Sequence, residues 1–181
     1  KIGDYMPFNW QDHIYDCDQP EMERAVRDIR AILNGYPEQY VVGETFLSNP
    51  SKLRRYAGED KLHAIFDFAF PVAKRTPDAY RKIIRAIEEN CGNEIWPTTV
   101  SNNHDLKRSA SRYGLGETDE RLKIHAALVL LLRGTPFIYY GEEIGQRETK
   151  VPRAKLMDPV GKRFWPINKG RDGCRAPMQW N

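Results

Sequence analysis

The sequence predicts an α/β fold in which parallel strands are connected by crossover helices. Short, nearly all-apolar segments alternate along the chain with longer segments that have helical periodicity, and this alternation is typical of parallel sheets. Strands that are apolar on both faces are expected where helices cover both sides of a sheet. The four predicted strands suffice for an incomplete barrel or for a small open sheet.

Start and stop signals mark the predicted helices. The first begins where Pro20 stands early and Glu21 opens an acidic first turn; apolar residues then recur at three-to-four spacing, which predicts one buried face. Another begins with Thr76 as its cap and ends at Gly92. The segment before Gly134 is so rich in leucine that we expect a strongly buried helix. Helices are therefore predicted over residues 19–34, 50–56, 76–91 and 119–133.

The predicted strands run into acidic residues. Glu44, Asp105 and Glu142 stand at or just after the ends of three of them. In a barrel of alternating strands and helices, the carboxyl ends of the strands form the rim on which catalytic groups are mounted. We expect Glu142 and its neighbour Glu143 to hold loops by ion pairs. Strands are predicted over residues 40–46, 64–70, 98–100 and 136–145, and residues 146–181 are expected to be a long loop.

The third predicted strand carries the strongest functional signal. It ends in Asn102, Asn103, His104 and Asp105, and basic and small residues suited to starting a helix follow at once. A strand with this ending delivers polar side chains to a surface. The alternative is a strand-to-helix loop in which the amides, the imidazole and the carboxylate form turns and a helix cap.

Two of the acids have contrasting surroundings. Glu44 follows an apolar strand, where its ionised form is disfavoured, so it could serve as a general acid. Asp105 stands beside His104 and near Arg108 and should stay ionised. Two carboxyl groups whose environments differ in this way are what glycoside hydrolysis requires. An acid that forms a loop or helix-entry salt bridge remains the structural alternative for Glu44.

The composition excludes several classes of partner. The 181 residues include 28 Lys and Arg and 25 Asp and Glu, a net charge of +3 that gives no reason to expect nucleic acid or an anionic membrane as partner. No apolar run approaches the roughly 18 residues that span a bilayer. Cys17, Cys91 and Cys174 are odd in number and far apart, so we expect inert thiols in a reducing cytoplasm, without a disulfide framework or a metal site.

Four segments resemble motifs of the α-amylase superfamily, family 13 of the glycoside hydrolases, and in particular its α-glucosidase and oligo-1,6-glucosidase branch. Val41–Glu44 is similar to the fifth-strand motif and Asn103–Asp105 to the seventh-strand motif. Residues 134–145 are similar to the eighth strand. Gly170–Trp180 resembles the Arg-Asp-Gly-x-Arg-Thr-Pro-Met-Gln-Trp signature of the branch, with Ala176 in place of the usual threonine.

The resemblance implies both a fold and a set of roles. Residues 1–181 would be the C-terminal half of a TIM-type (β/α)8 barrel, strands five to eight, with residues 146–181 as the loop after the eighth strand. Glu44 would be the general acid/base, and Asp105 the carboxylate that grips the hydroxyls of the reacting sugar most tightly in the transition state. His104 would bind the same sugar, Arg108 would lie toward the leaving group, and Arg175 would hold the non-reducing glucose. No cofactor or metal is implied.

The nucleophile of the family has no counterpart in this sequence. The resemblance implies retention of configuration through a covalent glucosyl-enzyme, formed by an aspartate in a Gly-x-Arg-x-Asp segment after the fourth strand. We therefore expect a fragment that is inactive alone. A half barrel exposes two sheet edges, so the missing N-terminal half or self-association should cover them.

Three interpretations of function remain open. The first is an α-glucosidase that acts on short α-glucosides. The second keeps the same site but passes the glucosyl group to a sugar acceptor, as trehalose synthase or sucrose-isomerising relatives do. The third is a non-catalytic interaction module with the same half barrel, as in the heavy chains of amino-acid transporters; glucoside binding without turnover would indicate it.

Overall fold

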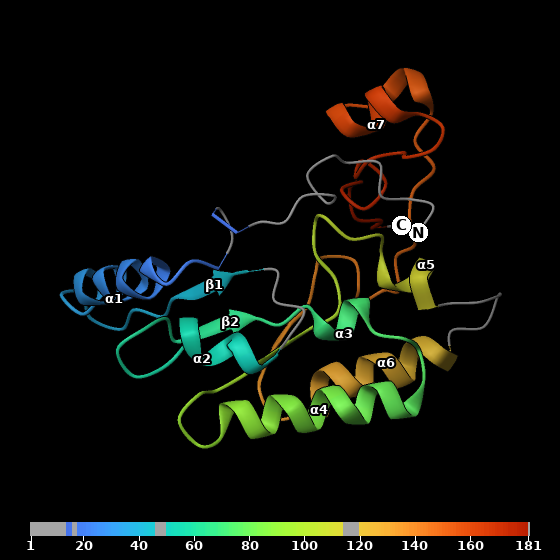
Figure 1. Ribbon diagram of the computed structural model, residues 1–181. Helices are drawn as coiled ribbons and strands as arrows, with labels where there is room; N and C mark the ends of the chain where they lie inside the picture. The colour runs from blue at the N-terminus through green and yellow to red at the C-terminus, as the bar shows by residue number, and fades with distance from the viewer. Residues whose placement is uncertain (1–13, 16–17, 46–49, 114–119, 181) are drawn as a thin grey trace. The chain divides into compact units, whose positions relative to one another are not determined.

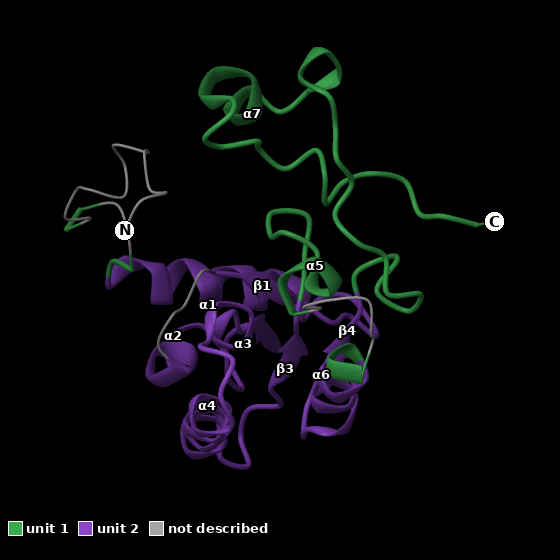
Figure 2. Ribbon diagram, turned by 90° about the vertical axis from the view of Figure 1, so that its right-hand side faces the viewer, with its two compact units in different colours: residues 1–19, 102–122, 139–181 green, residues 20–101, 123–138 purple. Residues whose placement is uncertain are grey.

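The chain forms two compact units. Figure 1 shows the computed structural model, in which residues 14–15, 18–45, 50–113 and 120–180 are described. Unit 1 combines residues 1–19, 102–122 and 139–181, and unit 2 combines residues 20–101 and 123–138 (Figure 2). The predicted α/β character belongs to unit 2, which contains all the described strands.

The strands of unit 2 are parallel, as predicted. β1 pairs with β2 and β3 with β4. Thr98 links the two pairs, because its hydroxyl donates a hydrogen bond of 2.7 Å to the carbonyl of Ile65 in the neighbouring pair. The rings of Phe66 and Phe137 meet edge to face with centroids 4.6 Å apart. The strands are β1 (Val42–Glu44), β2 (Ala64–Phe66), β3 (Thr98–Val100) and β4 (Thr135–Phe137).

Helices cover these strands. In both views α4 and α6 lie on the same side of the strands (Figures 1 and 2). The predicted cap of α4 is confirmed, since the side chain of Thr76 accepts a hydrogen bond of 3.3 Å from the amide of Ala79. The helices are α1 (Glu21–Leu33), α2 (Leu53–Tyr56), α3 (Ala69–Val72), α4 (Pro77–Cys91) and α6 (Glu120–Leu131), and the 3-10 helix η2 (Pro50–Lys52) precedes α2.

An apolar cluster of described residues forms the core of unit 2. Burial of these side chains removes apolar surface from water, which is the main favourable contribution to folding. Gly43 lets β1 approach closely, because a Cβ at this position would lie 2.5 Å from Cδ1 of Leu62. The buried side chains come from α1, α2, β2, α3, α4 and the neighbouring loops: Val26, Leu53, Tyr56, Ala57, Leu62, Ile65, Phe70, Ile87, Cys91 and Ile95.

Three of the four predicted strands are shorter than expected. The strand expected over residues 64–70 ends at Phe66, because the side chain of Asp67 accepts a hydrogen bond of 2.7 Å from the amide of Ala69 and turns the chain into α3. Residues 138–145 form no strand, and residues 140–145 form turns, in which the amide of Glu142 donates to the carbonyl of Tyr139 at 2.9 Å. The first strand is limited to Val42–Glu44, and residue 46, the last of its predicted range, lies outside the described part.

Two helices are less buried than the sequence indicates. In α1 only Val26 is buried, and Ile32 on its apolar stripe is 68% exposed. In α6 only His125 is buried, and Leu131 is 82% exposed. The prediction of a strongly buried helix over residues 119–133 is therefore wrong for the described chain, because the described segments cover only part of the surface of this largely apolar helix.

Unit 1 consists mostly of loops. This agrees with the prediction for residues 146–181, but a helix there was missed. The helix begins after Asp158, whose side chain accepts a hydrogen bond of 3.2 Å from the amide of Val160. Among the described helices, none is both long enough and apolar enough to cross a membrane. The elements of unit 1 are α5 (Ser109–Tyr113), the 3-10 helix η3 (Arg153–Lys155) and α7 (Pro159–Phe164).

Two of the cysteines are buried free thiols. Burial raises the pKa of Cys91 above its usual value. Burial and, next, the charge of Glu148 raise the pKa of Cys174 to about 11. Both thiols are therefore protonated at neutral pH, and the prediction of inert cysteines is confirmed for them. Cys17 lies outside the described residues.

Candidate active site

The segment after β3 is shaped by an asparagine. The side-chain oxygen of Asn103 accepts hydrogen bonds from the amides of Asp105, at 3.0 Å, and Leu106, at 2.9 Å. Such an asparagine turn sharply reverses the chain. Asn103 is thus the turn former that the structural alternative predicted. Asp105 is not the cap of the following helix, because α5 begins only at Ser109.

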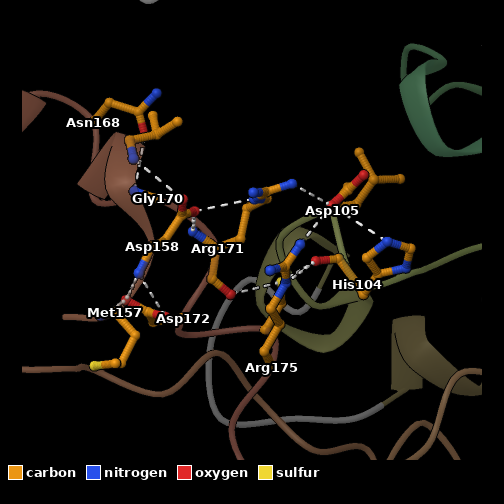
Figure 3. A network of polar contacts seen from close by, with 12 residues as sticks. His104, Asp105, Met157, Asp158, Asn168, Gly170, Arg171, Asp172 and Arg175 are labelled. Atoms are coloured by element: carbon orange, nitrogen blue, oxygen red, sulfur yellow. Dashed lines mark hydrogen bonds and ion pairs between the residues drawn. The ribbon is translucent and has the colours of Figure 1, made fainter. Parts of the chain in front are cut away.

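Two arginines hold the carboxylate of Asp105. Oδ1 accepts one hydrogen bond from Nη1 of Arg171 and another from Nη2 of Arg175, both of 2.9 Å (Figure 3). Nε2 of His104 lies 3.6 Å from the same oxygen. Partial burial raises the pKa of Asp105, but the hydrogen bonds from Arg171 and Arg175 outweigh it and hold this pKa below its usual value. Asp105 is therefore ionised at neutral pH, as expected, through these two arginines.

A buried aspartate fixes one of those arginines from the other side. The side chain of Asp158 has no exposed surface, and its Oδ2 accepts hydrogen bonds from the backbone amide of Arg171, at 2.7 Å, and from Nε of Arg171, at 3.0 Å. Gly170 permits this approach, since its φ is +70° and a Cβ there would lie 2.8 Å from the same oxygen. Figure 3 shows Arg171 extended between Asp158 and Asp105.

The environment of Asp158 predicts a pH-dependent contribution to stability. Burial raises its pKa, but the hydrogen bonds from Arg171 and Val160 outweigh that effect and lower it below 3.8. A carboxyl group with a depressed native pKa stabilises the fold above its unfolded pKa, and this contribution is lost as the pH falls through the native pKa. In the full-length protein, Asp158→Asn should lower the free energy of unfolding near neutral pH by about 1–3 kcal/mol.

Urea unfolding at a series of pH values measures this effect. The difference between wild type and Asp158→Asn should narrow as the pH falls below 3.8. Asp78→Asn is the matched control, because Asp78 also contacts an arginine, Arg81, but its side chain is exposed; a small change is expected there. An equal loss of stability at every pH would exclude the ionised form of Asp158 as the stabilising one.

The backbone of His104 holds the other arginine. Its carbonyl accepts hydrogen bonds from Nε of Arg175, at 2.9 Å, and from the thiol of Cys174, at 3.2 Å. The imidazole itself is about half exposed. Arg175 thus binds the carbonyl of His104 and the carboxylate of Asp105 together, which sets the orientation of both residues.

Arg108 is buried rather than presented to solvent. Only 1% of its surface is exposed, and its guanidinium donates to the carbonyls of Tyr140, at 2.6 Å, and Ala176, at 3.3 Å. The guanidinium carbon lies 5.1 Å from the ring centroid of Tyr139 and 4.7 Å from that of Tyr140, within the range of cation–π attraction. In this chain Arg108 ties the segment after β4 to the C-terminal loop.

Glu142 has the structural role that we expected, through hydrogen bonds. One carboxylate oxygen accepts from the hydroxyl of Ser109 at 2.7 Å, and the other accepts from the amide of Tyr139 at 2.9 Å. These contacts join the start of α5 to the turn after β4.

Glu44 belongs to unit 2, whereas the other predicted site residues belong to unit 1. It is the last residue of β1, and its side chain is exposed. Among the described residues, the burial that we expected around this carboxylate is therefore absent, because Glu44 stands at the very end of a strand of only three residues. Within unit 1, His104, Asp105 and Arg175 contact one another directly, and Arg108 reaches the same loop through the carbonyl of Ala176.

Arg171 and Asp158 are site residues that we did not predict from the sequence. Arg171 stands in the recognised Gly170–Trp180 segment, but nothing in the sequence indicates which of its arginines contacts Asp105. Asp158 precedes Pro159, and an aspartate before a proline is a start signal for a helix. That signal could have located α7, although its contact with Arg171, 13 residues further along, depends on the fold.

Known proteins resemble this chain over most of its length. The family model described as "Alpha amylase, catalytic domain" matches residues 2–181. A probable alpha-glucosidase of Rhizobium meliloti is 37% identical over 182 residues, which cover 96% of this chain and 32% of that protein. An oligo-1,6-glucosidase of Heyndrickxia coagulans is 26% identical over 204 residues, which cover 92% of this chain and 37% of that protein.

Solved structures show the same relationship. The structure of an alpha-glucosyl transfer enzyme, XgtA, superposes with a TM-score of 0.88 at 33% identity, over 96% of this chain and 33% of that one. The trehalulose synthase MutB of Pseudomonas mesoacidophila shares the fold, with a TM-score of 0.71 at 22% identity, over 91% of this chain and 35% of that one.

The chain thus spans about a third of the length of the relatives it matches. The structural neighbours are barrel enzymes of one family, and the small parallel sheets of unit 2 are consistent with part of such a barrel. With a family model that covers all but the first residue, the chain belongs to the α-amylase family.

Proposed function

We propose that the protein containing this chain is an α-glucosidase, a retaining glycoside hydrolase that acts on short α-glucosides. The observation that carries this proposal is the carboxylate of Asp105, held ionised between Arg171 and Arg175. Glycoside hydrolysis passes through an oxocarbenium-like transition state that develops positive charge on the sugar ring. A fixed anion beside the ring stabilises that charge more than it stabilises the neutral substrate.

We assign the individual roles as follows. Glu44 donates a proton to the glycosidic oxygen as the bond to the leaving group breaks, and later accepts a proton from the attacking water. Asp105 accepts hydrogen bonds from the sugar hydroxyls, His104 donates one to the same sugar, and Arg175 holds the non-reducing glucose. Arg108 acts on the leaving-group side, through the tyrosine segment that it holds.

The nucleophile is assigned to a segment outside these 181 residues. We place β1 to β4 as strands five to eight of a (β/α)8 barrel, and residues 146–181 as the loop after the eighth strand. Residues 1–181 would then be the C-terminal half of the catalytic barrel. The chain alone is proposed to be inactive, because these 181 residues supply no nucleophilic aspartate to form the covalent glucosyl-enzyme. Its exposed apolar side chains on α6 and α1 support association with the other half of the barrel or with a second copy.

The stereochemistry of the product tests the proposal. The full-length protein is mixed with maltitol or isomaltitol, whose leaving group is a sugar alcohol without an anomeric carbon, and the anomeric signals of the released glucose are followed by proton NMR. Retention predicts that α-glucose appears first and that β-glucose follows only by mutarotation. Early β-glucose, or no hydrolysis of either sugar, would contradict the assignment.

Glucosyl transfer is the second candidate. The similarity to an alpha-glucosyl transfer enzyme favours it, at 33% identity over 96% of this chain. With a large excess of acceptor sugar, a transferase should form mainly new disaccharides, whereas a hydrolase should form mainly glucose. Binding of a glucoside with neither product would instead support the interaction module that shares this half barrel.

A further inference from the structure

Unit 1 contains a cavity of about 470 Å³ next to Asp105 that the roles above do not use. This volume is within the range of sites that bind small molecules. Its wall includes Asp105 itself, the flat ring of Trp165 and three lysines. The lysines are Lys107, Lys150 and Lys169, and we call this space the lysine-lined cavity.

The charges around the lysine-lined cavity favour an anion. Lys107, Lys150 and Lys169 are exposed, and none of them forms an ion pair with another described residue. The negative charge of Asp105 is compensated by the two arginines that bind it. The other acid in the wall, Glu148, directs Oε2 to the backbone amide of Arg108 at 2.9 Å. The wall thus contains three ammonium groups and two carboxylates, and both carboxylates are already hydrogen-bonded.

The remaining wall suits a sugar. Trp165 offers an aromatic surface, and the ammonium group of Lys169 lies 5.4 Å from its ring centroid. Aromatic rings next to polar groups are suited to molecules that have one apolar face and one polar edge. A pyranose that carries an acidic group matches a cavity with both an aromatic wall and cationic side chains.

We propose that the lysine-lined cavity binds the anionic group, a phosphate monoester or a carboxylate, of a sugar seated beside Asp105. This deepens the proposed function and rests on it, since such a sugar would be the leaving group or the acceptor, next to the reacting glucose that Asp105 binds. The enzyme would then prefer glucosides with an acidic second sugar over neutral ones.

Direct binding measurements test this. Isothermal titration calorimetry on the full-length protein compares glucose 6-phosphate and glucuronate with glucose. Glucose 6-phosphate should bind about tenfold more tightly than glucose, because partly exposed ion pairs contribute a fraction of a kcal/mol each and several act together. If glucuronate binds as tightly, the site accepts a carboxylate; if it binds only as glucose does, the site requires a phosphate.

A triple substitution identifies the lysines. Lys107→Gln, Lys150→Gln and Lys169→Gln together should remove the preference for the anion. The matched control is Lys82→Gln, Lys155→Gln and Lys162→Gln, which removes the same charge outside the cavity wall and should keep the preference. Circular dichroism checks that both variants are folded. The preference should also shrink as ionic strength rises.

The outcomes separate this inference from the proposed function. Loss of the preference only in the cavity variant supports the site, even if the protein hydrolyses no glucoside. Hydrolysis of maltose together with equal binding of all three probes would overturn the site and leave the proposed function standing. An equal loss of preference in both triple variants would also overturn it, because net charge alone would then explain the binding.

Discussion

Replacing Asp105 by asparagine is expected to lower kcat for α-glucoside hydrolysis by the full-length enzyme by about a hundred- to a thousandfold. Asparagine keeps the shape of the side chain but removes the charge that Arg171 and Arg175 hold in place. The loss should appear in kcat more than in KM, because the carboxylate acts mainly on charge that develops in the transition state. Steady-state kinetics on maltose measures both constants.

Asp60→Asn is the control for Asp105→Asn. Asp60 also accepts a hydrogen bond from an arginine, with Oδ2 2.6 Å from Nε of Arg27, but it is an exposed residue of unit 2. Its substitution removes an aspartate–arginine pair without touching the candidate site, so kcat should not change. A loss of less than about tenfold in Asp105→Asn would mean that the carboxylate is no essential part of the site.

Replacing Glu44 by glutamine is expected to lower kcat/KM for maltose by about a hundred- to ten-thousandfold. Glutamine has the shape of the acid but cannot donate the proton that the leaving sugar needs. An aryl glucoside with p-nitrophenolate as leaving group needs little protonation, so its first step should be slowed far less. The substitution should therefore slow maltose hydrolysis much more than the first step on the aryl glucoside. Rate measurements on both substrates, for wild type and Glu44→Gln, test this.

Azide provides the second half of the Glu44 test. As a small anion, azide attacks the glucosyl-enzyme without a general base, so it should restore aryl-glucoside turnover in Glu44→Gln and give glucosyl azide. Glu59→Gln replaces another exposed acid of unit 2 and is the control. Its rates on maltose and on the aryl glucoside should equal those of the wild type, and azide should not raise them. Equal losses on both substrates, with no rescue by azide, would assign Glu44 a structural role.

Local signals predicted much of the architecture. The strand Thr98–Val100 has the predicted bounds, and α4 begins after Thr76 and ends before Gly92 as its capping residues indicate. These features depend on a few neighbouring residues, so the sequence displays them directly. The parallel arrangement followed from the alternation of strands and helices, and the register of β1 with β2 and of β3 with β4 confirms it.

Features that depend on distant residues could not be predicted. The turn that ends β2 results from a single contact between Asp67 and the amide of Ala69, in a segment whose composition is typical of a strand. The burial of α6 was overestimated, because apolar composition shows only that a helix can be covered and not which segment covers it. Arg171 and Asp105 are 66 positions apart in the sequence, so no local sequence pattern could predict that they form a hydrogen bond.

The candidate site was predicted in part. His104, Asp105 and Arg175 are brought together as the motifs suggested, because two recognised segments meet there. Arg108 lies against the rings of Tyr139 and Tyr140, and the sequence could not show that this arginine is buried. Its position depends on the turn after β4, which was predicted as a strand.

The hydrogen bond between Asp158 and the amide of Arg171 brings the two ends of residues 159–170 to one point. A loop closed at its base can be lengthened, shortened or exchanged at modest entropic cost. Such a change would leave the hydrogen bond between Arg171 and Asp105 in place. The same loop carries Trp165 and Lys169, two walls of the lysine-lined cavity. Selectivity could therefore diverge between relatives, or be redesigned by grafting, through this one insertion while the reacting groups stay fixed.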